Sequence, residues 1–344
     1  MNKPVRIITG FLGAGKTTYL NHLIKANPNK RYAIIENEFG EKSIDSELIF
    51  RPEDGIVELN NGCLCCTLND NLYDILNDLF DRREDFDEVI IEATGVADPA
   101  GLAEPFLTHP LIKEHFPLLG TICLIDTELI EEQIEETEEA LKQLTFSDIL
   151  LLNKADLVTS AYVEEVKKKM AAINPLASIY ISHQEEFPNF DLSLQKEQIE
   201  DQLISEINKI VPMEGLNLKA PHHHHDHEHT PNVVSFCFTF SKPFDYDLLY
   251  HNLFVYLRFQ SRNLFRMKGL LWLAEKEQQV VIQSVGKRMN FEEKRAWKEG
   301  ETRESNIVFI GKDLKRKGIE QLLQKCLSKN ASNTNKHSHK QAYG

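Results

Sequence analysis

Short, almost wholly apolar runs alternate with amphipathic stretches through the first two-thirds of the chain. Such runs are typical of strands that are buried on both faces, as in a parallel sheet covered by helices. The stretches between them, such as "KTTYLNHLIKA" and "NDNLYDILNDLFDRR", have helical periodicity. The alternation predicts an α/β domain with a mostly parallel sheet over residues 1–212. Its expected strands are residues 5–9, 32–36, 55–59, 88–94, 121–126, 148–153 and 178–182.

The pattern changes after residue 212. Residues 213–231 contain Pro, Gly and a histidine run without apolar periodicity, which predicts a mobile linker. We expect a smaller α+β domain over 232–328, and then a polar, disordered tail over 329–344. In this second domain the expected strands and helices are 233–240, 245–259, 269–275, 278–286, 306–311 and 313–327.

Charge and hydropathy narrow the possible partners. The 344 residues include 39 Lys and Arg against 53 Asp and Glu, a net charge of -14 that disfavours nucleic acid as a partner. No apolar run reaches the roughly 20 residues of a membrane span, and the N-terminus lacks a signal-peptide core. We therefore expect a cytoplasmic protein with no membrane partner, a monomer or homodimer, whose thiols stay reduced.

The segment "GFLGAGKTT" at 10–18 fits the pattern G-x-x-x-x-G-K-[ST]. It follows an expected strand and opens an expected helix, which is the context of a phosphate-binding loop. Backbone N–H groups and the helix N-terminus would hold a polyphosphate, Lys16 would reach its β and γ phosphates, and Thr17 would bind Mg²⁺. The expected nucleotide contacts in this loop are Gly10, Gly13, Ala14, Gly15, Lys16, Thr17 and Thr18.

The string "NKAD" at 153–156 closes another expected strand. The Asp156 carboxylate could accept two hydrogen bonds from guanine, whereas adenine would leave it facing an acceptor. Asn153 would bond the base edge and the stem of Lys154 would cover the ring. This predicts GTP over ATP; the less specific interpretation is a polar loop in which Asp156 caps a helix.

The string "IIEATG" at 90–95 supplies the third expected nucleotide element. Glu92 closes a hydrophobic strand and would hold the hydration shell of Mg²⁺, and the Gly95 N–H would face the γ-phosphate. Lys16, Thr17 and Glu92 are therefore the candidate catalytic residues.

Three of the six cysteines, Cys63, Cys65 and Cys66, crowd into "NNGCLCC". Thiolates bind Zn²⁺, and three donors leave one position of a tetrahedral site open, which suits a site that receives and releases metal. The cluster precedes the Glu92 strand, in an interval where phosphate-loop proteins carry segments that respond to the γ-phosphate. It could therefore sense the nucleotide.

Other residues could add metal ligands. Glu36, at the end of an expected strand, is the first candidate; Glu41, His109 and His115 are weaker, and the histidines are expected at a surface or a helix end. The remaining cysteines are expected to pack in apolar surroundings: Cys123, Cys237 and Cys326.

The string "HHHHDHEH" at 222–229 is internal, irregular and interleaved with acids, which favours a native metal-attracting tract over a purification tag. A flexible tract of this kind would raise the local metal concentration through many weak sites. Its histidines are His222, His223, His224, His225, His227 and His229.

Taken together, these motifs resemble the metal-binding GTPase family named for the cobalamin-synthesis protein CobW. The resemblance runs from residue 4 to about residue 327 and rests on "GFLGAGKTT", "IENEFGE", "NNGCLCC", "IEATGVADP", "LLNKADL", "RMKGLLW" and "NIVFIG". It implies slow GTP hydrolysis, a metal at Cys63, Cys65 and Cys66 with Glu36 as a neighbour, and delivery to a client metalloprotein. The family includes zinc chaperones and maturation GTPases for nickel enzymes.

The favoured hypothesis is a GTP-driven metallochaperone that uses GTP and Mg²⁺ and delivers Zn²⁺ to a client metalloprotein of unknown identity. One alternative is a GTPase that matures a cobalt, nickel or iron enzyme. A non-catalytic metal store and a thiol redox sensor are the others.

Overall fold

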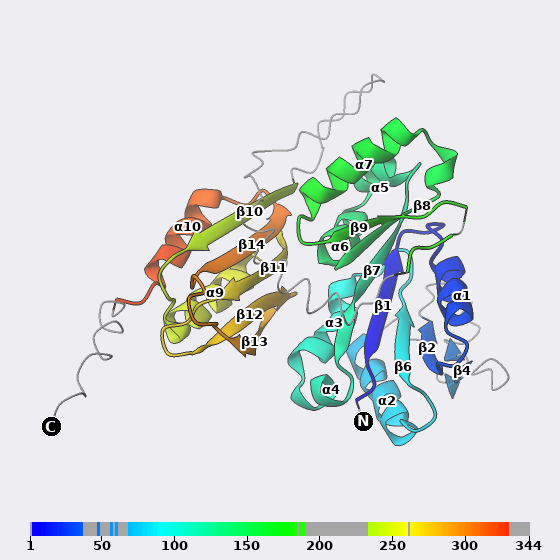
Figure 1. Cartoon of the computed structure of the whole chain (residues 1–344), viewed down its shortest axis with the longest axis horizontal. Coiled ribbons are helices and arrows are strands. Elements are labelled where there is room, and N and C mark those ends of the chain that lie inside the picture. Colours follow the sequence, from blue (N-terminus) through cyan, green and yellow to red (C-terminus); the bar gives the residue numbers. More distant parts are fainter. Residues whose placement is uncertain are drawn as a thin grey trace. The chain divides into compact units, whose positions relative to one another are not determined.

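The computed structural model describes residues 2–36, 47–48, 56–57, 59–60, 68–184, 186–189, 233–260 and 262–329. The chain divides into two compact units, which are drawn in Figure 1 and are described here one at a time. The cysteine motif, the histidine tract and most of the predicted linker and tail lie outside the described residues. In the described part of the chain, no helix is both long and apolar enough to cross a membrane.

The first unit is built on one sheet with the strand order β5-β3-β2-β6-β1-β7-β8-β9, with β4 paired to β2. All pairings from β2 to β9 are parallel, whereas β3 pairs antiparallel to both β2 and β5. The strands are β1 (Val5–Gly10), β2 (Tyr32–Glu36), β3 (Glu47–Leu48), β4 (Ile56–Val57), β5 (Leu59–Asn60), β6 (Glu88–Glu92), β7 (Leu118–Asp126), β8 (Ile149–Asn153) and β9 (Ser178–Ile181).

Helices cover this sheet because its central strands are apolar on both faces. Every residue of β1 and of β8 is buried, as the continuous apolar runs predict. One face packs its apolar side chains against Tyr19 and Leu20 of α1. The helices are α1 (Lys16–Ala26), α2 (Leu68–Asp81), α3 (Pro99–Thr108), α4 (Pro110–His115), α5 (Ile130–Glu136), α6 (Glu138–Phe146) and α7 (Ser160–Ile173), with a short 3-10 turn at Ala155–Leu157.

The second unit carries its own sheet, with the strand order β10-β14-β11-β12-β13. The pairings of β11 with β14 and β12, and of β12 with β13, are antiparallel. Its elements are β10 (Val233–Phe240), α9 (Tyr246–Gln260), β11 (Leu264–Leu271), β12 (Gln278–Val285), β13 (Arg288–Ala296), β14 (Ser305–Lys312) and α10 (Arg316–Lys325). The predicted fold class, a P-loop GTPase domain with a mostly parallel sheet and a smaller α+β domain, is confirmed.

Several element boundaries differ from the sequence prediction. The expected strand 88–94 ends at Glu92, so its last two residues leave the sheet, and the expected strand 55–59 is divided between β4 and β5. The strand expected at 269–275 begins earlier and ends at Leu271. The short β3 and the edge strand β13 were not predicted at all.

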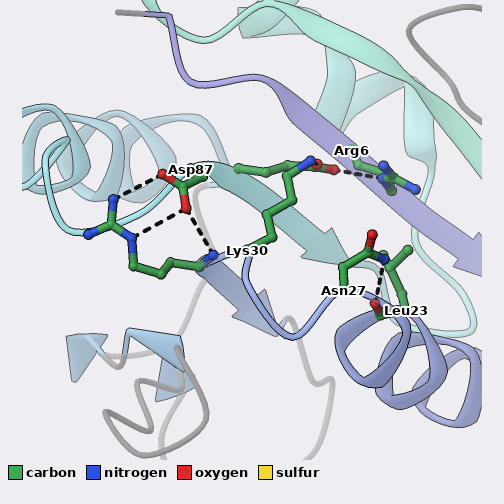
Figure 2. A network of polar contacts seen from close by, with 7 residues as sticks. Arg6, Leu23, Asn27, Lys30 and Asp87 are labelled. Carbon is green, nitrogen blue, oxygen red and sulfur yellow. Dashed lines mark hydrogen bonds and ion pairs between the residues drawn. The ribbon is translucent and has the colours of Figure 1, made fainter.

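Charged side chains are paired with one another at the amino-terminal ends of β1 and β6 (Figure 2). Glu88 is fully buried and accepts hydrogen bonds from Arg6 Nε, at 2.7 Å, and from Lys30 Nζ. Burial lowers the pKa of Arg6, but Glu88 and two nearby tyrosines outweigh it, so that the pKa lies above its ordinary value. Beside this buried group, the more exposed Asp87 carboxylate pairs with Arg31. We call Arg6, Glu88 and the partly exposed Lys30 the buried ion group, after its buried carboxylate.

Candidate nucleotide-binding site

The loop between β1 and α1 has a backbone that requires glycine. Gly10 has a φ of 136°, and a Cβ there would lie 2.2 Å from the carbonyl oxygen of Leu124. Gly15, at the N-terminus of α1, has a φ of 96°, and its Cβ would lie 2.4 Å from the Asn153 amide nitrogen. Gly13 also has a positive φ. Glycine at positions 10 and 15 therefore lets the loop approach β7 and β8 closely, and backbone N–H groups of such a loop can turn toward a polyphosphate.

Lys16 is the first residue of α1, and its side chain folds back over this loop. Its ammonium donates to the carbonyl oxygens of Gly10, at 3.0 Å, and Phe11, at 3.2 Å. Burial lowers the pKa of Lys16 below its ordinary value, although Glu92 and Cys123 partly oppose the shift. An anionic phosphate in the loop would stabilise the charged form that burial disfavours.

Thr17 and Glu92 meet at the carboxyl edge of the sheet. The Thr17 hydroxyl donates to Glu92 Oε1 at 2.8 Å, which brings together one residue from α1 and one from the end of β6. A hydroxyl and a carboxylate are oxygen ligands of the kind that Mg²⁺ prefers, and Mg²⁺ usually takes its other ligands from water and phosphates. In the described part of the chain, His, Cys, Asp and Glu side chains form no group of three or more that could hold a metal ion.

The loop after β6 lies directly against the phosphate loop. A Cβ on Gly95 would lie 2.7 Å from the backbone nitrogen of Leu12. The buried amide of Gln143, on α6, donates to the carbonyl oxygens of Gly95, at 3.0 Å, and Ala97, at 3.3 Å. Sequence reasoning missed Gln143, because one glutamine in an amphipathic helix carries no pattern that points to a loop 48 residues earlier.

The "NKAD" segment begins at Asn153, the last residue of β8, at the same edge of the sheet. Asn153 donates its amide to the Ala14 carbonyl oxygen at 2.9 Å, so it ties this segment to the phosphate loop. Lys154 has a φ of 58° and pairs with Asp126 at 2.7 Å. The predicted contact of Asn153 with the base edge and the predicted cover by Lys154 remain predictions.

Asp156 is exposed and keeps its carboxylate ionised. Backbone N–H groups, above all that of Gln184 at 3.0 Å, hold the pKa of Asp156 below its usual range. The following helix, α7, is capped by Thr159, so Asp156 is not its N-cap. The interpretation of Asp156 as a helix cap is thereby excluded for α7, and a role in guanine recognition remains the prediction.

Most of the proposed metal ligands lie outside the described residues: Cys63, Cys65, Cys66, Glu41 and the six histidines of residues 222–229. The backbone of Glu36 is described: it ends β2 and is the register partner of Glu92 on β6. His109 is the N-cap of α4 and packs against Tyr73, whereas His115 is the last residue of α4 and packs against Phe80. The helix-end interpretation of both histidines is confirmed.

The three single cysteines fit the predicted packing role. Cys123 and Cys326 are buried and Cys237 is partly buried. Burial raises the pKa of Cys123 to about 12, so this thiol stays protonated and is a poor metal ligand.

A mostly parallel sheet with a glycine-rich phosphate loop, a Thr–Glu pair and an "NKAD" segment along one edge defines a P-loop GTPase domain. The family described as "CobW/HypB/UreG, nucleotide-binding domain" matches residues 4–181, and the "Cobalamin synthesis protein cobW C-terminal domain" matches residues 233–327. The chain belongs to this family.

Similar proteins cover nearly the whole chain. The zinc chaperone YjiA of Escherichia coli is 31% identical over 320 residues, which is 92% of this chain and 96% of that protein. The zinc chaperone CobW of Pseudomonas aeruginosa is 30% identical and covers 94% of this chain over 92% of its own length. The crystal structure of Zn(II)-bound YjiA GTPase from E. coli has a TM-score of 0.67 and 27% identity, over 95% of this chain and 100% of that one.

Proposed function

We propose that this chain is a GTPase that binds Zn²⁺ at its Cys-x-Cys-Cys motif and hands it to a client metalloprotein. The GTPase part of the proposal is supported by the grouping of Lys16, Thr17 and Glu92 at the mouth of a phosphate loop. The names of two similar proteins, the zinc chaperones YjiA and CobW, and the Zn(II)-bound crystal structure of YjiA support the zinc-binding part of the proposal.

Each nucleotide residue has a distinct part in this proposal. The backbone of Gly13–Gly15 and the ammonium of Lys16 bind the phosphates, while Thr17 and Glu92 hold Mg²⁺. The bound ion supplies positive charge against the phosphates. Asp156 selects guanine by accepting its two N–H groups, and the Gly95 N–H faces the γ-phosphate.

In this proposal, Zn²⁺ is the cargo that the protein binds and then transfers to its client. The ligands are the thiolates of Cys63, Cys65 and Cys66, which the reducing cytoplasm keeps available, with Glu36 beside them. The position of Glu36 supports coupling to the nucleotide, because its neighbour across β2 and β6 is the Mg²⁺ candidate Glu92. A change in the strand end that carries Glu92 can therefore reach Glu36 within one strand spacing.

The test is a titration of Zn²⁺ into three proteins, each with and without a non-hydrolysable GTP analogue: the unaltered chain, the Cys65→Ser/Cys66→Ser double variant, and a variant lacking residues 222–229. We expect the analogue to tighten zinc binding in the unaltered chain by about 5- to 150-fold, and zinc to tighten analogue binding by the same factor. The double variant should lose the tight site and the coupling. The tract deletion should keep both and load more slowly from scarce metal.

The alternatives give different results in the same experiment. A metal store predicts several metals per chain and no effect of nucleotide, and a redox sensor predicts reversible oxidation of Cys65 or Cys66 without metal. A maturation factor for another metal predicts that Co²⁺, Ni²⁺ or Fe²⁺ gains more affinity from the analogue than Zn²⁺ does. Loss of coupling in the tract deletion, with coupling kept in the double variant, would contradict the proposal.

A further inference from the structure

A buried amide on α6 holds the loop that follows β6. Gln143 is only 1% exposed, and its Nε2 donates to the carbonyl oxygens of both Gly95 and Ala97. A carboxamide presents two N–H donors on one nitrogen, so it can bridge two carbonyl groups of one loop. A glutamate of the same size would present only acceptors to those carbonyl groups.

The loop is otherwise fixed mainly at its two ends. The Ala93 N–H donates to the Ile8 carbonyl oxygen at 2.8 Å, and Asp98 caps α3. Between them, the Ala97 N–H bonds to the Thr94 carbonyl oxygen within the loop itself. Among the hydrogen bonds of the described residues, those of the Gln143 amide thus join the middle of the loop to another element.

The same loop carries a buried hydroxyl, that of Thr94, for which a bound ligand could be the partner. This hydroxyl has no hydrogen-bond partner among the described residues. Native proteins seldom leave such a group unpaired, and exceptions often mark functional sites or a bound molecule. Thr94 lies between Glu92 and Gly95, the two residues that we assign to Mg²⁺ and the γ-phosphate.

The support of Gln143 is rigid and continues to the phosphate loop. The amide of Asn174, fully buried, donates to the carbonyl oxygens of Leu144, at 2.8 Å, and Ser147, at 2.9 Å, which fixes the end of α6. The chain then runs directly into β8, whose last residue, Asn153, bonds to Ala14 of the phosphate loop. One continuous α6–β8 segment therefore holds both loops that would face the terminal phosphate.

We infer that Gln143 is a positioning residue that keeps the Gly95 loop in place for the γ-phosphate, and so sets the preference for nucleoside triphosphate over diphosphate. This inference rests on the proposed function of the same site. A diphosphate has no group that reaches toward Gly95, so loss of the Gln143 bridge weakens triphosphate binding selectively.

The test compares Gln143→Met, which keeps the length but removes the donors, with Gln143→Glu and with Thr145→Val as a matched control. Thr145 is a buried neighbour on α6 whose hydroxyl bonds within its own helix, to the Leu141 carbonyl oxygen. The Kd values for GDP and for a non-hydrolysable GTP analogue are measured with Mg²⁺ for each protein, together with kcat and KM. Gln143→Met should lose about 5- to 50-fold in affinity for the analogue, Gln143→Glu should lose more, and GDP affinity should stay within about twofold.

Equal losses for the two nucleotides, or no loss for either, would overturn the inference, because a purely structural role does not separate them. The same holds if Thr145→Val shows the selective loss. If Gln143→Met does not fold, Gln143→Asn replaces it, since the shorter side chain keeps both donors but cannot reach both carbonyl groups. Failure of the unaltered protein to bind either nucleotide would instead overturn the proposed function, and that result is visible before any variant is compared.

Discussion

The two ends of the central strands differ in how their charged residues are satisfied. At the amino-terminal ends, the buried carboxylate of Glu88 is matched by Arg6 and Lys30, so the charges of the buried ion group are paired within the protein. At the carboxyl edge, the ammonium of Lys16 is held by backbone carbonyl oxygens, and the carboxylate of Glu92 by a hydroxyl. The first arrangement is complete without a ligand, and the second offers groups that phosphate and Mg²⁺ bind better.

This difference separates structural charges from functional ones. Taking a charge out of water costs free energy, and in the buried ion group the opposite charge offsets that cost. Around Lys16 the cost of burying the ammonium is offset only in part, so the pKa of Lys16 lies below its ordinary value. A charged group whose burial is offset only in part within the protein is a candidate for a binding site. Changes at the two ends should therefore act on different properties of the protein.

The largest effect is expected for Lys16→Ala. Removing an ammonium that meets the phosphates should reduce GTP turnover by about 10²- to 10³-fold or more, as for other preorganised charge donors. The free energy of unfolding should fall by only about 1–3 kcal/mol, because two part-buried hydrogen bonds to loop carbonyl oxygens are lost. Phosphate release and urea unfolding measure the two quantities. Lys30→Ala is the matched control and should leave turnover intact. Equal losses of turnover in both variants would show that the two ends of the central strands do not differ in function.

The next effect concerns stability. Glu88→Gln removes the charge that both Arg6 and Lys30 face, and breaking a buried ion pair from one side typically costs about 3–5 kcal/mol. Urea unfolding should show a loss of that size. The affinity of the folded variant for GTP, measured at a temperature where it remains folded, should match that of the unaltered chain. A large loss of affinity with unchanged stability would place Glu88 in the binding site.

A smaller effect is expected for base selection. Asp156→Asn replaces a carboxylate, which accepts two hydrogen bonds, with an amide that accepts through one atom only. The preference for GTP over ATP should fall by about 10- to 100-fold. Competition of GTP, ATP and XTP against a fluorescent GDP measures it, and XTP should gain because its base presents an acceptor to the new N–H₂. ATP that competes equally with GTP in the unaltered chain would show that the guanine interpretation is wrong.

The sequence predicts those features of the site that are contiguous in the chain. The phosphate loop, its strand and its helix lie within residues 5–26, so one local motif fixes their relation. The strand ends Glu92 and Asn153 could be assigned to the same edge, because carboxyl ends of parallel strands lie together. The apolar runs of β1, β6, β7 and β8 made that sheet predictable.

The features that depend on distant pairs could not be predicted. Arg6 and Glu88 are 82 residues apart, and nothing local in either segment records that they meet. The same is true of Gln143 and Gly95, and of the amide of Asn153, which binds Ala14 139 residues away. Strand β13 was missed because most of its residues are charged and none is fully buried, as is common in an edge strand, so that no alternation of apolar residues marks it.

The smallest effect is expected for the exposed pair beside the buried ion group. Hydrogen bonds from the Arg31 side chain, joined by its backbone N–H, hold the pKa of Asp87 below its ordinary value, against a weaker opposing effect of burial. Because the unfolded chain binds a proton more readily, the pair contributes stability above the ordinary carboxyl pKa of about 4. That contribution is lost as the pH falls through the lower pKa of the folded state.

Asp87→Asn should therefore reduce the free energy of unfolding by less than about 1 kcal/mol near neutral pH, since the pair is exposed to solvent and its charges are screened. The difference between Asp87→Asn and the unaltered chain should shrink as the pH is lowered below about 4. Urea unfolding across this range, repeated with Arg31→Gln and with the double variant, isolates the pair from other carboxylates. A difference that stays constant with pH would mean that Asp87 stabilises the fold by packing, and that the ion-pair interpretation of Asp87 and Arg31 is wrong.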